Sequence, residues 1–349
     1  MSSFLSEPIY VGDASSPASP AAQAQVDQLV DYVNEQIELL AFDEPDSFLL
    51  RQMVQCLVDP RRATRLSLVD ALSQIGEPAT PFLLEGLEHH DQPVVRRACC
   101  NALTNIGDPA AVSALIEALT HDADISVKSA AAGALATVGV PAFDSLRDVL
   151  ADTEVSESSK GHAAWAIASM SSEVGEKLYR NMSHPAASVR TAVIGAIAQL
   201  AQKQMAHLCE QTAKEPLSKQ PPKQPQTGQP SPKARPENVK KALSIMTEAL
   251  SDHSPEVRIE AAANLARLKC QTAYQPLVAC LKDSDAEVRK AAAMALAKLG
   301  NPAAIEAIAL LERDAEASVR RIATLMIAQL KALRDTAGDK SGAEASSKK

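Results

Sequence analysis

Hydrophobic and polar positions along this chain repeat with a period of about 31 residues. Aligning the chain on one basic residue per unit gives successive spacings of 31, 32, 32, 30, 68, 31 and 31, where 68 spans a doubled period plus an insertion. The eight anchor residues are Arg65, Arg96, Lys128, Lys160, Arg190, Arg258, Arg289 and Arg320. A constant period of this length indicates a solenoid built from one repeated supersecondary unit.

Each unit carries the pattern of an amphipathic helix. Valine usually stands one residue before the anchor, alanine usually six after it, Leu or Ile seven after it, and another aliphatic residue or methionine ten after it. These offsets lie on one face of an α-helix, and the alanines allow neighbouring helices to approach closely. The helix usually ends at a glycine, which adopts a positive φ without steric cost, as at Gly76, Gly107, Gly139 and Gly300.

A shorter helical segment precedes this helix in each unit, as in AAVSALIEALT at residues 110–120. Two antiparallel helices per unit predict an all-α fold, an α-solenoid of about eight short helical hairpins. An aspartate usually stands six residues before the anchor, as at Asp122, Asp252, Asp283 and Asp314. We expect this aspartate to cap the second helix and the basic anchor to bind the aspartate of an adjacent unit.

The repeats divide the chain into five segments. We expect a disordered tail over residues 1–22, a helical cap and repeats over 23–201, a Pro-, Gln- and Lys-rich insertion over 202–237, further repeats over 238–334, and a disordered tail over 335–349. The insertion is locally basic. It is therefore either an arm for an acidic partner or a tolerated surface insertion.

Composition narrows the functional classes. The net charge of −8 gives the molecule no electrostatic reason to bind nucleic acid. No apolar run approaches the roughly 20 residues that span a bilayer, and the N-terminus lacks the pattern of a secretory signal. The six cysteines show no CxxC or zinc-ligand spacing, which predicts reduced thiols in a cytoplasmic protein.

The repeated pattern D-x-x-x-x-V-R-x-x-A-x-x-A-L-x-x-[IL]-G resembles HEAT repeats over roughly residues 50–200 and 237–333. Its short, alanine-rich form resembles the phycobilisome-lyase subclass, and ESSKGHAAWAIASM at residues 157–170 is most similar to cyanobacterial members. This resemblance implies bilin lyase-like action on the C–S thioether between a phycobiliprotein cysteine and a linear tetrapyrrole such as phycocyanobilin. It implies attachment or detachment of the pigment with no required cofactor. The alternative is a non-catalytic scaffold that binds another protein in its concave groove.

In HEAT arrays the second helices line the concave surface, and the fifth residue after each anchor points away from the packed face. The only tryptophan, Trp165, occupies this position between Gly133 and Gly195 of the neighbouring units. These glycines predict a hollow beside the indole that would accept a flat pigment or a partner's helix. The other candidate groove residues are His162, Asn101, Arg97 and Asp70, and the same offset also selects Ala263, Met294 and Leu325. For His162 and Trp165, packing between repeats is the competing interpretation.

No motif in the sequence identifies catalytic residues. The chain has no His-Glu dipeptide for a di-iron site, no P-loop and no G-x-S-x-G, so we expect no metal site and assign no catalytic residue. Cys99 and Cys100 occupy positions that small core residues hold in other units, so we interpret them as core residues and not as nucleophiles. Whether the protein is an enzyme therefore stays open.

Overall fold

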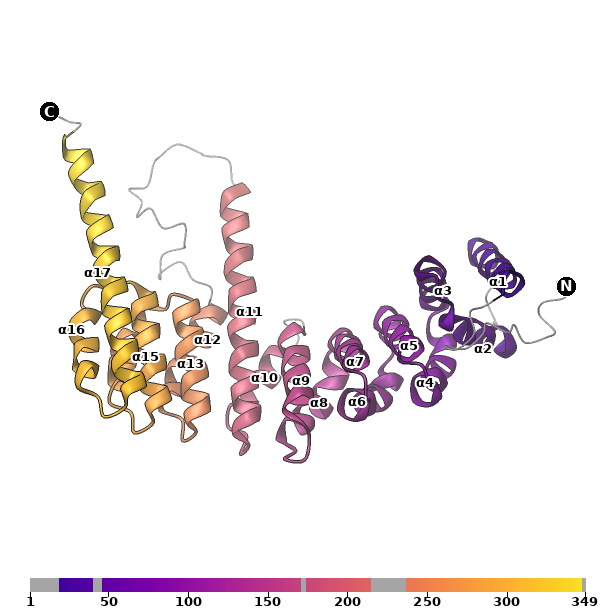
Figure 1. Cartoon of the computed structure of the whole chain (residues 1–349), viewed down its shortest axis with the longest axis horizontal. Coiled ribbons are helices and arrows are strands. Elements are labelled where there is room, and N and C mark those ends of the chain that lie inside the picture. The colour runs from indigo at the N-terminus through magenta and orange to yellow at the C-terminus, as the bar shows by residue number, and fades with distance from the viewer. Residues whose placement is uncertain (1–18, 40–45, 171–173, 215–236, 347–349) are drawn as a thin grey trace. The chain divides into compact units, whose positions relative to one another are not determined.

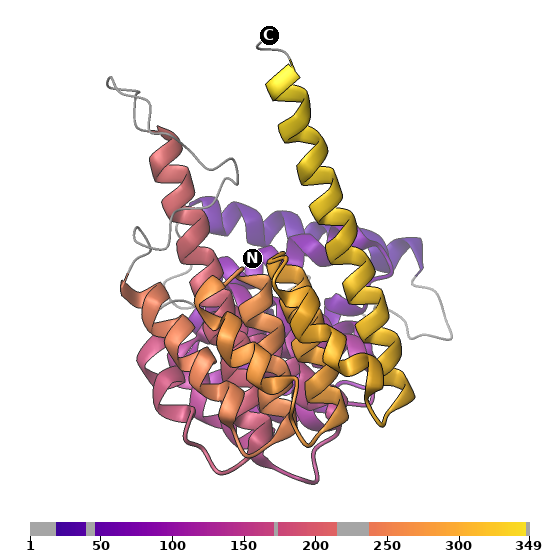
Figure 2. The ribbon, with the colours of Figure 1, turned by 90° about the vertical axis from the view of Figure 1, so that its left-hand side faces the viewer.

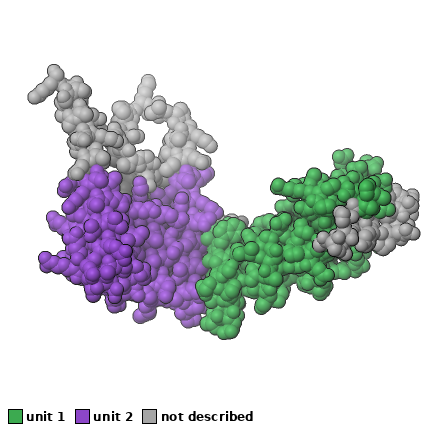
Figure 3. All heavy atoms as spheres, viewed as in Figure 1, with its two compact units in different colours: residues 1–174 green, residues 175–349 purple. Residues whose placement is uncertain are grey.

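The computed structural model describes residues 19–39, 46–170, 174–214 and 237–346, with side chains described up to residue 207 and from 237 to 334. Every regular element in these ranges is an α-helix or a short 3-10 helix, which confirms the all-α prediction (Figure 1). The chain divides into two compact units, residues 1–174 and 175–349 (Figure 3). Each unit is a stack of helical hairpins, as expected for an α-solenoid.

The described residues of the first unit form one cap helix and four hairpins. The cap helix α1 (Pro20–Glu38) begins at the N-cap Ser19, whose hydroxyl accepts the Ala22 N–H, and it packs against α3. The hairpins are α2 (Ser47–Gln55) with α3 (Arg62–Ile75), α4 (Thr80–His89) with α5 (Pro93–Ile106), α6 (Val112–His121) with α7 (Ile125–Val138), and α8 (Phe143–Ala151) with α9 (Glu157–Ser169).

In the second unit, the part of the chain that the structure describes forms four further hairpins. They are α10 (Gly175–Asn181) with α11 (Ala187–Lys214), α12 (Glu237–Glu248) with α13 (Pro255–Arg267), α14 (Tyr274–Cys280) with α15 (Ala286–Leu299), and α16 (Ala304–Ala309) with α17 (Ala317–Ser346). All eight anchors therefore lie in the second helix of a hairpin, as the period predicts.

The core of each unit runs between successive second helices. α3, α5, α7 and α9 pack in series in the first unit, and α11, α13, α15 and α17 do so in the second. The predicted face is buried: Ala102, Ala134 and Ala295 are at most 2% exposed, and the residue after each of them is fully buried. Gly76, Gly107, Gly139 and Gly300 end their helices with φ between 71° and 80°, which confirms their predicted role.

The chemistry of the repeated turn differs in one respect from the sequence prediction. The basic anchor does bind the next repeat's aspartate, as in Arg96–Asp122, Arg258–Asp283 and Arg289–Asp314. That aspartate does not cap the second helix, however. Its carboxylate accepts the N–H two residues ahead, at distances of 2.8–2.9 Å, and so closes the turn between the two helices. The residue at that second position, such as Asp285, is the N-cap.

Two helices extend beyond the predicted repeat boundaries. α11 continues from residue 201 to Lys214 through a segment rich in Ala, Gln and Lys, and the first proline after it is Pro216. α17 continues through Ser346 into the segment expected to be a disordered tail, which contains no proline (Figure 2). Most of the predicted insertion, residues 215–236, and most of the N-terminal tail, residues 1–18, lie outside the described residues.

The position of the insertion also differs from the boundary between compact units. The predicted insertion separates the repeats at residues 202–237, whereas the compact units divide between Val174 and Gly175. The reason is packing: α11 contacts both α12 and α13, although the insertion separates them in sequence. The hairpin α10–α11 therefore belongs with the C-terminal repeats.

Candidate functional site

The fifth residue after each anchor points toward solvent, as predicted from helical periodicity. Trp165, Met294 and Leu325 are 55%, 50% and 59% exposed, whereas the residue that follows Trp165, Ala166, is fully buried. Large apolar side chains held this far into water are uncommon enough to mark a contact surface when they are grouped. The two units present different groups of such residues on this face.

In the first unit, the exposed indole of Trp165 projects from α9 beside α7, the helix that carries Gly133. A methyl group added at Gly133 would meet no atom within 4 Å, and the same holds for Gly161 on α9. The surface around these glycines is thus open. Gly195, the second glycine of the predicted hollow, belongs to the other compact unit.

His162 lies on the same helix and is partly buried. Its Nδ1 donates to the Ser158 carbonyl oxygen at 2.9 Å, since a carbonyl can only accept, so this ring nitrogen is engaged within its own helix. A helix-bound ring fits the packing interpretation of His162 and leaves Nε2 as the nitrogen able to meet a ligand.

The three other predicted groove residues are exposed polar side chains on two neighbouring helices. Asp70 lies on α3, and Arg97 and Asn101 lie on α5. The adjacent turn of this face carries a direct link between the two helices, because Asn105 Nδ2 donates to Ser73 Oγ at 3.1 Å. This part of the face is polar, in contrast to the surroundings of Trp165.

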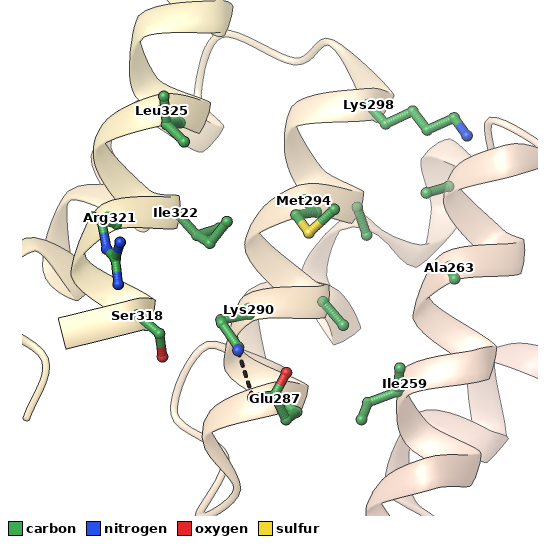
Figure 4. Close-up of a pocket in the computed structure, with 13 residues that line it drawn as sticks. Ile259, Ala263, Glu287, Lys290, Met294, Lys298, Ser318, Arg321, Ile322 and Leu325 are labelled. Carbon is green, nitrogen blue, oxygen red and sulfur yellow. Dashed lines mark ion pairs between the residues drawn. The ribbon is translucent and has the colours of Figure 1, made fainter. Parts of the chain in front are cut away.

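In the second unit, the same face forms a groove of about 650 Å³ between α13, α15 and α17 (Figure 4). Met294 of α15 lies between Ile322 and Leu325 of α17 on one side and Ile259 of α13 on the other. Alanines fill the lining between these larger side chains: Ala263, Ala266, Ala291 and Ala295. The groove is therefore an apolar hollow bordered by larger aliphatic groups.

Charged side chains border this groove, and most are cationic. Lys290 pairs with Glu287 one helical turn before it on α15. Lys298 and Arg321 also line the groove, and neither forms an ion pair with any residue in the described ranges. On a chain with a net charge of −8, this gives the groove a local excess of positive charge.

The sequence contained the signal for this groove. Ala263, Met294 and Leu325 are the fifth residues after three consecutive anchors, the rule that selected Trp165. What the offset alone missed is the contribution of Ile259 and Ile322, one and two residues after their anchors. A search for adjacent repeats with apolar residues one, two or five positions after the anchor would have located the site.

The described residues bear on two kinds of chemical site, a metal centre and a reactive thiol. Within the described residues, no group of three or more His, Cys, Asp or Glu side chains is placed to hold a metal ion. Cys56, Cys99 and Cys100 are buried, and burial raises the pKa of the Cys56 and Cys100 thiols to about 12. Such thiols stay protonated at neutral pH and are poor nucleophiles, in agreement with the core interpretation of Cys99 and Cys100.

None of the single helices in the described part of the chain combines the length and hydrophobicity needed to cross a bilayer. One pair, Ile125–Val138 followed by Val140–Ala151, meets the criterion by length and composition but bends by 119° at the break.

Comparisons with known proteins place these features in context. A family profile described as HEAT repeats matches residues 80–160 and 243–336. No curated protein sequence matches the chain. Among solved structures, the chain is similar to an engineered protein at 19% identity, covering 95% of this chain and 90% of the other with a TM-score of 0.34.

Two natural proteins are also similar in structure. Human deoxyhypusine hydroxylase, solved in complex with glycerol, is 21% identical over 75% of this chain and 98% of its own, with a TM-score of 0.30. The karyopherin Kap121p, bound to the C-terminus of the phosphatase Cdc14p, is 14% identical over 95% of this chain and 37% of its own, with a TM-score of 0.48.

Proposed function

This chain belongs to the HEAT-repeat family, and we propose that it is an interaction scaffold that binds a partner protein in the groove of its C-terminal repeats. The observation that carries the proposal is the group formed by Ile259, Met294, Ile322 and Leu325 around an alanine-lined hollow. Met294 and Leu325 are at least half exposed, so contact with a partner would remove substantial apolar surface from water.

The position of the groove on the second helices also favours binding. Other faces of α13, α15 and α17 form the core between repeats. Ala266 and Ala295 are buried at the base of the groove, whereas Met294 and Leu325 project into solvent and are free to contact a partner. A rigid array of three helices holds them in a fixed arrangement, which reduces the entropy lost when a partner binds.

Site-specific crosslinking in the source cell tests this function. A photo-crosslinking amino acid placed at Met294 should capture a defined partner, and the same residue placed at the exposed turn position Lys282 should not. Adding Leu325→Glu to the Met294 probe should abolish the captured band while the protein keeps its circular dichroism spectrum. Equal capture from both positions would contradict a groove-directed scaffold.

A second function follows from the resemblance of residues 157–170 to the phycobilisome-lyase subclass. We propose, as the alternative, that the protein binds a linear tetrapyrrole or a phycobiliprotein subunit and assists attachment or detachment of the pigment. The supporting observation is the exposed indole of Trp165 beside Gly133, where open space would accept a flat conjugated ring.

Titration with phycocyanobilin tests this alternative. A saturable, red-shifted absorbance band that weakens in Trp165→Ala would support pigment binding at the first unit. Trp165→Phe is the matched variant, because it keeps an aromatic ring at the same position. An unchanged pigment spectrum in the presence of the folded protein would contradict the bilin function and leave the scaffold function in place.

A further inference from the structure

We infer that the partner segment of the C-terminal groove is an amphipathic α-helix with acidic residues beside its apolar face. This inference rests on the proposed scaffold function and adds the chemistry of the occupant. It comes from three properties of the groove: its shortage of backbone hydrogen-bonding partners, its dimensions, and the sign of its charges.

The hydrogen-bonding capacity of the groove favours a helix over an extended peptide. Its lining consists of aliphatic and alanine side chains with Ser318 and four charged residues. Most of these residues lie inside helices, where the backbone groups are already hydrogen-bonded to one another. An extended peptide would bury N–H and C=O groups without partners there. A helix brings its own backbone hydrogen bonds and presents side chains only.

The dimensions of the groove set the length of that helix. The groove crosses three neighbouring second helices, α13, α15 and α17. Packed helices lie about 8–10 Å apart, so three of them span about 16–20 Å, which corresponds to roughly 11–13 residues of helix. Apolar residues at i, i+4, i+7 and i+11 of such a segment form a stripe about 16 Å long, which would lie along the row of Ile259, Met294 and Leu325.

The charges of the groove select the acidic version of this helix. Glu287 already neutralises Lys290, which leaves Lys298 and Arg321 as the cations able to pair with an incoming group. They border the groove from two different helices, α15 and α17 (Figure 4). A helix with carboxylates flanking its apolar stripe would pair with them, whereas a basic helix would bring like charges together.

Two designed peptides test the inference on the full-length protein. Both are stapled, fluorescein-labelled helices with the same leucine stripe, and one carries Glu where the other carries Lys on the flanking positions. Fluorescence anisotropy should show the Glu peptide binding at least about tenfold more tightly at low salt, as expected for two partly exposed charge pairs plus removal of repulsion. The difference should shrink at high salt because the charges lie near the surface.

Charge reversal locates the binding. Lys298→Glu combined with Arg321→Glu should weaken the Glu peptide about tenfold and strengthen the Lys peptide. Lys282→Glu combined with Arg313→Glu makes the same change in net charge at exposed positions outside the groove and should leave both affinities within about twofold. Met294→Glu should weaken both peptides, because it places a charge on the apolar floor.

Each contrary result has a defined meaning. Equal binding of the two peptides, no binding of either to the folded protein, or equal effects of the two charge-reversed pairs would overturn the inference. A partner crosslinked at Met294 through a basic or extended segment, or a second copy of this chain crosslinked there, would also overturn it. Capture of a partner through a basic or extended segment would leave the scaffold function standing, because the groove would still bind another protein. Loss of groove-specific crosslinking would remove the scaffold function itself.

Discussion

Arg258 holds Asp283 with two parallel hydrogen bonds, from Nε to Oδ2 at 2.8 Å and from Nη2 to Oδ1 at 2.7 Å. The third guanidinium nitrogen, Nη1, donates to the carbonyl oxygen of Asp252, at the turn of its own repeat. One side chain therefore joins the turns of two successive repeats. Both partners are nearly buried, at 12% and 13% exposure, so water competes with this link only weakly.

The Arg–Asp pairs that join successive repeats, such as Arg258–Asp283, form a ladder along the chain. Removing one carboxylate of this ladder should destabilise the protein without changing the groove. We expect Asp283→Ala to lower the free energy of unfolding by about 1–3 kcal/mol, because it leaves Nε and Nη2 of Arg258 and the Asp285 N–H without their acceptors. Asp148→Ala is the matched control, since Asp148 pairs with Arg147 but is 68% exposed. Urea denaturation measures both, and equal losses for the two variants would show that the ladder adds no more than a surface pair.

The ladder also predicts how stability depends on acid. Burial raises the pKa of Asp283, but hydrogen bonds from Arg258 and from the Asp285 N–H outweigh it, and the pKa lies below its ordinary value of 3.8. The unfolded chain therefore binds this proton more readily than the folded protein. The stabilisation is fully present above the unfolded pKa and is lost as pH falls through the lowered folded value.

The measurement is urea denaturation of the wild type and Asp283→Asn from neutral pH down to about pH 2. The wild type should lose stability more steeply than Asp283→Asn in the acidic part of this range, because the variant lacks one titrating carboxylate. Parallel curves for the two proteins would contradict a stabilising role for the ionised Asp283. Asp148→Asn, which removes an exposed carboxylate, serves as the control.

A histidine interrupts the ladder in the first unit. His90 stands six residues before Arg96, where most repeats have aspartate, and its Nδ1 accepts the Gln92 N–H at 3.0 Å. Arg65, the anchor of the preceding repeat, donates to the Asp59 carbonyl as Arg258 does to Asp252, and in the described residues it makes no carboxylate pair. The ladder is thus incomplete between these two repeats.

Replacing His90 by aspartate should complete the ladder between these two repeats. His90→Asp is expected to stabilise the protein by about 0.5–1.5 kcal/mol at neutral pH, because Arg65 gains a carboxylate and the turn keeps its acceptor. His90→Asn supplies the acceptor without the charge and separates the two effects. Thermal and urea denaturation at neutral pH make the comparison, and an Asp variant no more stable than the Asn variant would contradict the expected ion pair.

The repeats were predictable from sequence because one physical pattern recurs eight times. Helical periodicity identified the buried face, and the regular aspartate and arginine spacing identified the Arg258–Asp283 link. The structural role of the aspartate six residues before the anchor was not predictable. The residue that caps the helix and the residue that closes the turn lie only two positions apart, and both positions favour aspartate. Only the structure shows that Asp285 caps α15 while Asp283 closes the turn.

The candidate site was only partly predictable for a different reason. The fifth-residue offset selects exposed positions correctly, including Trp165 and Met294. An offset describes one helix, however, whereas a groove depends on how three helices place their neighbouring side chains together. A rare residue such as tryptophan attracted attention in the sequence, while the common residues Ile259 and Ile322 completed the larger hollow.

The two helical glycines Gly86 and Gly133 should respond in opposite ways to the same substitution. A Cβ at Gly86 would lie 2.7 Å from Val54 Cγ1 and 2.9 Å from Cys99 Sγ, so α4 is held against its neighbours by the absence of a side chain. Gly86→Ala should therefore destabilise the first unit by about 1–3 kcal/mol through overpacking.

At Gly133 the added methyl meets nothing within 4 Å, so Gly133→Ala should stabilise α7 by about 0.5–1 kcal/mol through its higher helix propensity. Urea denaturation of the two variants decides the matter, and a loss of stability in Gly133→Ala would mean that the open surface beside Trp165 is more tightly packed than the structure describes.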